Sequence, residues 1–425
     1  MATIRSQGKI LDNLERSYFP HPKWGRDWSN LADGPTGLIA ERLLANDVAD
    51  YICFRAVCCP WRRCSTDPRA QGAMDRRFHP RKWIMLRETP DHRLLFLNVS
   101  TGRCIRALLP ELHGCRVLGS SAEGLLVLLH RASYVVRLLN PLTCQVIDLP
   151  PATTVLRRSC YAVDLPPTYN MSSAFEVSGV GLADDSTFAI YFFRFGVLAV
   201  AQPGDKCWTI VHQRHLNSQA ISVDGRFYCH TNRGVMVVEI SADQPPRLVL
   251  AADLTKVLSR MSSSAHLVDN GGELILVYRT IQQRRCPSDE EEESSGGKWK
   301  EFIKYDAYRV DLKAMDAKHV TRLGGRAIFI GLRTALSVST SVFPSIKSDS
   351  IYVGRDLIML GTNRGVYCLM DGTTEPCGII RHGGFDKECG SEIGPWGIDD
   401  CLSVYVTDAH HVGNLNKIKG MPDDD

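Results

Sequence analysis

The pattern of apolar and polar positions changes character near residue 80. Between residues 28 and 66, apolar side chains recur at the three- and four-residue spacing of amphipathic helices. After Trp83, short apolar runs alternate with turn residues, and segments of helical period are nearly absent. The pattern therefore predicts a small α-helical module followed by a large, mainly β region.

The first helix of the module is expected to begin at Gly34-Pro35, because a proline at the first helical position loses no hydrogen bond. Its apolar face comprises Leu38, Ile39, Leu43 and Leu44. Asn46-Asp47 interrupts this helix and supplies a cap for the next one.

The second helix carries an apolar stripe at the spacing i, i+3, i+4, i+7, made of Phe54, Val57, Cys58 and Trp61. Pro60 is expected to kink or end it near Cys59, since proline breaks the helical hydrogen-bond ladder. Two or three short helices cannot bury both of their faces alone. The module is therefore either a cap on the larger domain or a surface for docking.

The β region repeats one unit: a Gly or Asp turn, two apolar strands with a polar tip between them, and a short strand or proline. Copies begin at Glu123, Asp224, Asn270 and Asp349, with a looser copy at Ser186. Irregular spacings of roughly 40–50 residues are typical of β-propeller blades. This spacing predicts a propeller of about six or seven blades, and a pair of β-sandwiches is the competing architecture.

The chain is divided as follows: a flexible N-terminal arm (1–27), the helical module (28–66), a polar linker (67–82), the propeller (83–410) and a loose tail (411–425). Within the propeller, residues 286–298 contain five consecutive acids followed by small residues and are expected to form a disordered acidic loop.

Composition restricts the binding partners and the cellular compartment that are expected for this protein. The formal net charge of +3 favours neither nucleic acid nor membrane, and Arg76, Arg77, Arg81 and Lys82 are interpreted as a solvated linker. The longest apolar stretch, residues 189–201, is broken by Arg194 and Gly196 and is too short to span a bilayer. Without an export signal in the first 27 residues, the 15 cysteines are expected to be reduced, in the cytoplasm or nucleus.

No catalytic, cofactor-binding or metal-binding motif is found, and we expect a protein that is not an enzyme. The adjacent His410 and His411 would point apart on a strand. The acid pairs Asp184-Asp185 and Asp399-Asp400 fall where turns are expected. The tryptophans expected to pack blades or lie on the surface are Trp208, Trp299 and Trp396.

The helical module resembles an F-box, the motif that docks a protein onto the Skp-type adaptor of a Skp–cullin–F-box ubiquitin ligase. The residues that carry the resemblance, and that it implies as adaptor contacts, are Leu31, Leu38, Ile39, Leu43, Leu44, Phe54, Val57, Cys58 and Trp61. The first half departs from the pattern, since Ala32 replaces a proline and Pro35-Thr36 replace an apolar pair. This departure leaves an alternative: a propeller that binds proteins but no longer joins a ligase.

The resemblance extends along the β region. The segments HPRKWIML, FLNVSTG, VRLLNPLT, HLVDNGGEL and LGGRAIFIG are similar to those of the large plant family of F-box proteins with a KIB-type β-propeller. The resemblance implies that the propeller recruits a protein substrate for ubiquitination. The chemistry would then belong to other subunits, and this chain would contribute proximity.

Overall fold

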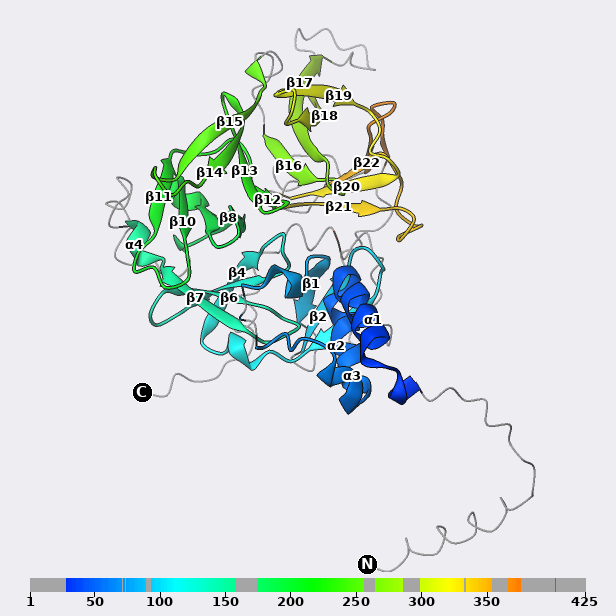
Figure 1. The fold of residues 1–425 in the computed structure, drawn as a ribbon. Helices are drawn as coiled ribbons and strands as arrows, with labels where there is room; N and C mark the ends of the chain where they lie inside the picture. The colour runs from blue at the N-terminus through cyan, green and yellow to red at the C-terminus, as the bar shows by residue number, and fades with distance from the viewer. Residues whose placement is uncertain are drawn as a thin grey trace, which may run out of the picture.

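The computed structural model describes residues 28–70, 72, 74–88, 93–156, 174–255, 264–285, 299–331, 334–353, 366–375 and 402. These residues form a six-bladed β-propeller with a short N-terminal helical region (Figure 1). The sequence prediction of a mainly β propeller is confirmed, with the blade number at the lower end of the expected range. The predicted arm, acidic loop and tail, His410-His411, Asp399-Asp400 and Trp396 lie outside the described residues.

The helical region contains a 3-10 turn, η1 (Trp28–Asn30), and three helices, α1 (Asp33–Asn46), α2 (Val48–Val57) and α3 (Cys59–Arg63). The first helix begins at Asp33, two residues before Pro35, the residue expected at the first helical position. Pro35 still lies within the first turn, where its missing N–H needs no partner. As expected, Asp47 caps α2. The helix breaks at Cys58, with Pro60 in the first turn of α3.

Six sheets follow in chain order. The first contains β1 (Trp83–Glu88), β2 (Leu94–Asn98) and β3 (Cys104–Ala107). The second contains β4 (Cys115–Ser120), β5 (Leu126–His130), β6 (Val135–Leu139) and β7 (Val146–Pro151). The third contains β8 (Val177–Leu182), β9 (Phe188–Phe192), β10 (Val197–Ala201) and β11 (Thr209–Gln213). The four-residue helix α4 (Thr153–Leu156) lies between these two sheets in the chain.

The fourth sheet contains β12 (Ile221–Val223), β13 (Arg226–Thr231), β14 (Gly234–Glu239) and β15 (Arg247–Asp253). The fifth contains β16 (Ala265–Asp269), β17 (Leu274–Arg285), β18 (Trp299–Asp311) and β19 (Asp316–Val320). The sixth contains β20 (Arg326–Ile330), β21 (Ala335–Ser339), β22 (Ser350–Val353), β23 (Val366–Cys368) and β24 (Thr374–Glu375).

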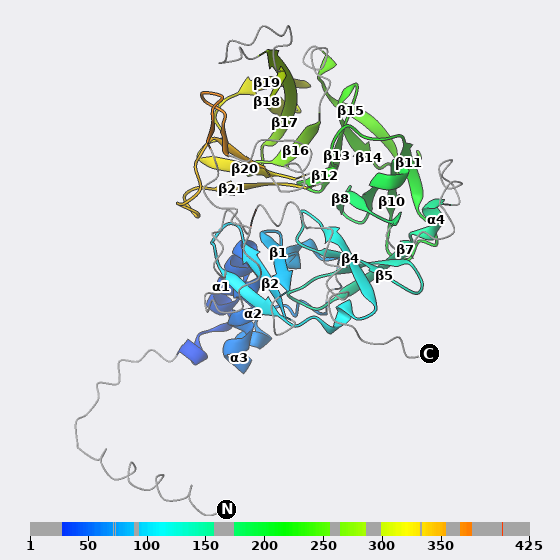
Figure 2. The ribbon, with the colours of Figure 1, turned by 180° about the vertical axis from the view of Figure 1, so that it is seen from behind.

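The second to fifth sheets are antiparallel meanders in which each strand pairs with the next. The repeat read from Glu123 corresponds to β5–β7, and the repeat read from Asp224 corresponds to β13–β15. The sixth sheet is irregular, with the order β21-β20-β22-β23-β24 and a parallel pairing of β20 with β22. Figure 2 shows the same ring from behind.

An apolar cluster fills each interface between neighbouring sheets. Between the second and third sheets, Trp208 is completely buried and its indole N–H donates to the carbonyl of Pro150 at 2.9 Å, as expected of a blade-packing tryptophan. At the closure of the ring, Ile84 and Leu97 of the first sheet pack with Phe329 of the sixth. Every blade therefore buries both faces against its neighbours, which a single sheet of this size cannot do alone.

Candidate functional site: the helical module and its junction with the propeller

The carboxylate of Asp47 joins the helical module to the first blade. It caps α2 by accepting the backbone N–H of Ala49, and it also accepts the indole N–H of Trp83 and the amide N–H of Asn98, each at 2.9 Å. Trp83 and Asn98 are directly paired across β1 and β2, so the sheet register presents both donors to one acceptor. Asp47 is 8% exposed, and the junction is therefore a buried, hydrogen-bonded contact.

Residues 76–80, which lead from the helices into the first strand, pack against the propeller. Phe78 is buried beside Tyr51, with 5.9 Å between ring centroids, and its carbonyl accepts the side-chain N–H of Asn140 at 2.8 Å. Gly124, in the β4–β5 turn, has a φ of +81° and lies so close to Pro80 that a Cβ would stand 2.0 Å from the Pro80 carbonyl oxygen. This part of the predicted solvated linker is thus packed against the propeller.

A buried arginine, Arg55, holds the end of the helical region in place. Arg55 donates to the carbonyl of Arg62 and the hydroxyl of Ser65, and pairs with Asp67 at 3.3 Å. The hydroxyl of Tyr51 donates to the carbonyl of Thr66 at 2.7 Å. Together with the Asp47 contacts, these bonds fix the helices to each other and to the blade. Figure 1 shows α1 and α2 beside β1 and β2.

The structure separates the sequence-predicted docking residues into three groups. Leu44 and Phe54 are buried, at 6% and 5% exposure. Four are partly buried: Leu31, Leu43, Cys58 and Trp61. Three are exposed: Leu38 at 68%, Ile39 at 39% and Val57 at 62%. The apolar side chains that a partner can reach without opening the module are therefore those of the third group.

Trp61 belongs mainly to the packing of the module itself. Its ring stacks on Phe54 with 4.6 Å between centroids, and its indole N–H donates to the carbonyl of Trp28 at 3.0 Å. Trp28 is 57% exposed and adds an apolar side chain that the F-box pattern did not single out. In the sequence, only the position of Trp28 at the start of the helical pattern could have suggested that it belongs to this surface.

The departure from the F-box pattern at Thr36 has a structural role. Thr36 is fully buried, and its hydroxyl donates to the carbonyl of Ala32 at 2.9 Å. Pro35, beside it, is exposed. Thr36 therefore stabilises the first turn of α1, and neither position presents the apolar chain that the family pattern would.

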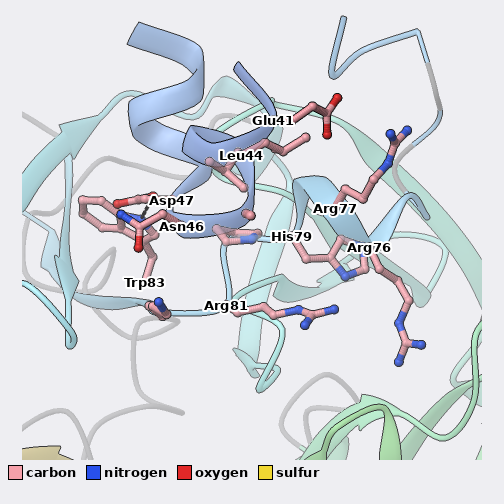
Figure 3. A pocket seen from close by; sticks show the side chains of 13 residues that line it. Glu41, Leu44, Asn46, Asp47, Arg76, Arg77, His79, Arg81 and Trp83 are labelled. Atoms are coloured by element: carbon pink, nitrogen blue, oxygen red, sulfur yellow. Dashed lines mark hydrogen bonds between the residues drawn. The ribbon is translucent and has the colours of Figure 1, made fainter. Parts of the chain in front are cut away.

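A pocket of about 430 Å³ lies between the end of α1, the start of α2 and residues 76–83 (Figure 3). Four cationic side chains and two carboxylates line it: Arg76, Arg77, Arg81, Lys82, Glu41 and Asp47. Arg76 pairs with Asp185 of the β8–β9 turn, and Arg77 pairs with Asp75 at 2.7 Å. The Arg77 guanidinium lowers the pKa of Asp75 through this hydrogen bond. Two of the four cations are thus paired with carboxylates, and Glu41 and Asp47 add two negative charges to the lining, so the pocket lacks the charge excess typical of a nucleic-acid site.

Metal sites, disulfides and membrane-spanning helices are not found among the described residues. No three His, Cys, Asp or Glu side chains are grouped to hold a metal ion there, and the described cysteines form no disulfide. None of the described helices is long and apolar enough to cross a membrane. Asp184 accepts the backbone N–H of Ser186 and of Thr187, at 2.8 and 2.7 Å, which is the turn-forming role expected of it.

Comparison with known proteins gives one family match. A model described as the KIB1-4 beta-propeller matches residues 96–370, and no F-box family model matches the helices. No curated protein matches significantly.

Several solved structures are similar at low identity. A streptogramin B lyase is 8% identical over 64% of this chain and 87% of its own, with a TM-score of 0.26. The Nup133 β-propeller domain of Vanderwaltozyma polyspora is 8% identical over 56% of this chain and 65% of its own, with a TM-score of 0.31. YCF48 from Cyanidioschyzon merolae is 12% identical over 54% and 66%, with a TM-score of 0.27. At these values the similar structures do not indicate a function.

Proposed function

Because this chain belongs to the KIB1-4 β-propeller family, we propose that it is the substrate-receptor subunit of a Skp–cullin–F-box ubiquitin ligase. Its helical module docks the Skp-type adaptor, and its propeller recruits the protein to be ubiquitinated. The transfer chemistry belongs to the other subunits, and this chain supplies proximity by holding the target near them.

The observation that supports this proposal most is the exposure of Leu38, Ile39 and Val57 on helices that are fixed to the propeller. Burying such side chains against a partner releases about 25 cal/mol per Å² of apolar surface. A receptor also needs a defined geometry between adaptor and target, since a freely moving link lowers the effective concentration of the target. The hydrogen bonds of Asp47 provide that geometry.

The alternative function is a propeller that binds proteins without joining a ligase. The observation that favours it is the first turn of α1, where Pro35 and the buried Thr36 replace the apolar pair of the F-box pattern. A missing apolar contact of about 1.4 kcal/mol lowers affinity tenfold. The adaptor interaction therefore depends on how much binding the remaining exposed side chains supply.

The test is isothermal titration of the full chain with a purified Skp-type adaptor. We expect saturable binding by the wild type and at least a tenfold higher Kd for Leu38→Ala with Ile39→Ala, because docking energy is concentrated in a few buried side chains. The matched control is Leu108→Ala with Ile281→Ala, which removes apolar groups that are 64% and 48% exposed on the propeller and should leave Kd within twofold. Circular dichroism checks that each variant is folded.

A further variant separates the two functions. Pro35→Leu restores one exposed apolar side chain of the pattern, while the buried Thr36 is left intact. If this variant binds at micromolar concentration and the wild type does not, the ligase role fails for this chain and the alternative holds. If neither binds, the module is not an F-box.

A further inference from the structure

Sheet register places four polar side chains on one face of the fifth sheet. Arg279 is directly opposite Tyr305, and its backbone N–H donates to the carbonyl of Ser264 at 3.0 Å. His266 is opposite Val277, two residues from Arg279 along β17. Because side chains alternate along strands and paired residues share a face, the Ser264, His266, Arg279 and Tyr305 side chains lie on the same side.

This face is turned toward the sixth sheet. The residues that continue it, Val277 and Ala307 among them, pack in one cluster with Ile328 and Ile351. The ring of Tyr305 contacts Tyr367 of β23 edge-on, with 5.1 Å between centroids. Figures 1 and 2 both show β16–β18 beside β20. The four polar side chains therefore form the polar end of an otherwise apolar interface.

The polar atoms of this group are buried and have no hydrogen-bond partner among the residues that the structure describes. They are Nε of Arg279, both ring nitrogens of His266, the hydroxyl of Tyr305 and the hydroxyl of Ser264. His266, Arg279 and Tyr305 are 2%, 6% and 5% exposed. Leaving a buried polar group without a partner is destabilising, so a cluster of such groups on one face requires an explanation.

Arg279 also lacks a counter-charge. No carboxylate of the described residues lies within ion-pair distance of it, and Asp306, next to Tyr305, pairs instead with Lys304 at 2.8 Å. Burial lowers the pKa of His266 to about 4, with the charge of Arg279 adding to the effect, so this imidazole is neutral. Burial raises the pKa of Tyr305 to about 12, so its hydroxyl keeps its proton. A buried cation without a compensating negative charge is strongly destabilising.

We propose that Arg279, with Ser264, His266 and Tyr305, binds a small oxyanion of the carboxylate or phosphate class between the fifth and sixth blades. A guanidinium presents parallel N–H donors that match the two oxygens of such an anion, and the hydroxyl groups add further donors. A cation is disfavoured by the charge of Arg279. The deep burial of the group restricts the ligand, or the part of it that enters, to a few atoms.

The site is separate from the proposed docking face. Ser264 directly precedes β16, and Arg279 lies near the middle of β17, where its backbone N–H meets the Ser264 carbonyl. Both residues are separated from the β16–β17 turn by the length of β16. The corresponding turns of other blades, at Gly124 and Asp185, are those that contact residues 76–80. Oxyanion binding and adaptor binding can therefore succeed or fail independently of each other.

The experiment is calorimetric titration of the full chain with sodium phosphate and with sodium acetate, at constant ionic strength set with sodium chloride. We expect saturable binding of at least one of the two anions. The anion that binds with the lower Kd identifies the class of ligand. Arg279→Gln should abolish binding. The matched control Arg309→Gln, which removes a charge from β18 that pairs with Glu273 at 3.2 Å, should bind as the wild type does.

Tyr305→Phe keeps the ring and removes only the hydroxyl, so it tests the site even if the arginine variant fails to fold. Loss of one hydrogen bond of about 1 kcal/mol predicts a roughly fivefold higher Kd. Binding retained by Arg279→Gln, an unchanged Kd for Tyr305→Phe, or no saturation by either oxyanion at tens of millimolar would each overturn the proposal.

Discussion

At the scale of single residues, the carboxylate of Asp47 joins the helical module to the first blade. It accepts three hydrogen bonds, from the α2 backbone, from Trp83 and from Asn98. Asp47→Ala leaves three buried donors without a partner, and each costs about 1–3 kcal/mol. We predict a loss of at least about 3 kcal/mol in the free energy of unfolding, measured by urea denaturation.

The control for this prediction is Asp50→Ala, three residues away on α2. Asp50 pairs with Arg103 at a partly exposed site, where such pairs contribute less than about 1 kcal/mol. If the two variants lose equal stability, Asp47 does not fasten the module to the blade.

A second residue-scale prediction concerns pH. Burial lowers the pKa of His230 to about 4 from its ordinary value of 6.5, and its ring accepts or donates a hydrogen bond with the Tyr278 hydroxyl at 2.8 Å. Between these pH values the unfolded chain binds a proton that the folded chain does not, so stability rises with pH there and falls on acidification. Lowering the pH from 7.5 to 5 therefore decreases the free energy of unfolding by about 2 kcal/mol for one such histidine.

We therefore expect His230→Gln to show a smaller drop in urea midpoint between pH 7.5 and pH 5 than the wild type. His113→Gln, which changes an exposed imidazole, should follow the wild type. An unchanged pH dependence in His230→Gln would show that this histidine is not held neutral by burial.

At the scale of elements, the contact between residues 76–80 and the propeller turns can be tested at a glycine. Gly124 has positive φ and no room for a Cβ beside the Pro80 carbonyl, whereas Gly204 has a φ of +92° and no atom within 4 Å of the Cβ position. An alanine in the left-handed region costs about 1–2 kcal/mol in either place. We predict that Gly124→Ala lowers unfolding stability clearly more than Gly204→Ala does, because it must also displace Pro80. Equal losses would mean that the segment is not seated there.

The elements also show what sequence alone can predict. The strand repeats from Glu123 and Asp224, the Asp47 cap and the break near Pro60 follow from local pattern, and all are found. Which face of each helix is buried cannot be predicted from the local sequence. Leu38 and Leu44 have the same chemistry, and only contacts with distant residues such as Phe78 bury the second.

The candidate sites depend still more on distant pairing. Asp47 meets Trp83 and Asn98 because strands 36 and 51 residues away in sequence are in register. The lack of a partner for Arg279 can be recognised only after β17 is aligned with β16 and β18. The F-box resemblance predicts a set of docking side chains, and only the folded structure distinguishes the exposed members of that set from those in the core.

At the scale of the whole molecule, the described residues form a closed ring of six blades, and the helical module is attached to the first blade. Because the module shares the buried contacts of Asp47 and Phe78 with the propeller, the two parts are expected to unfold together. A docked adaptor would then stand in a fixed position relative to whatever the propeller binds.

The most direct test of the central claim is hydrogen–deuterium exchange of the full chain with and without a Skp-type adaptor. We predict slower exchange in α1 and α2, around Leu38 and Val57, while propeller amides remote from the junction keep their rates. Unchanged exchange in these helices at saturating adaptor, or protection confined to the propeller, would contradict the claim that the helical module is the docking site.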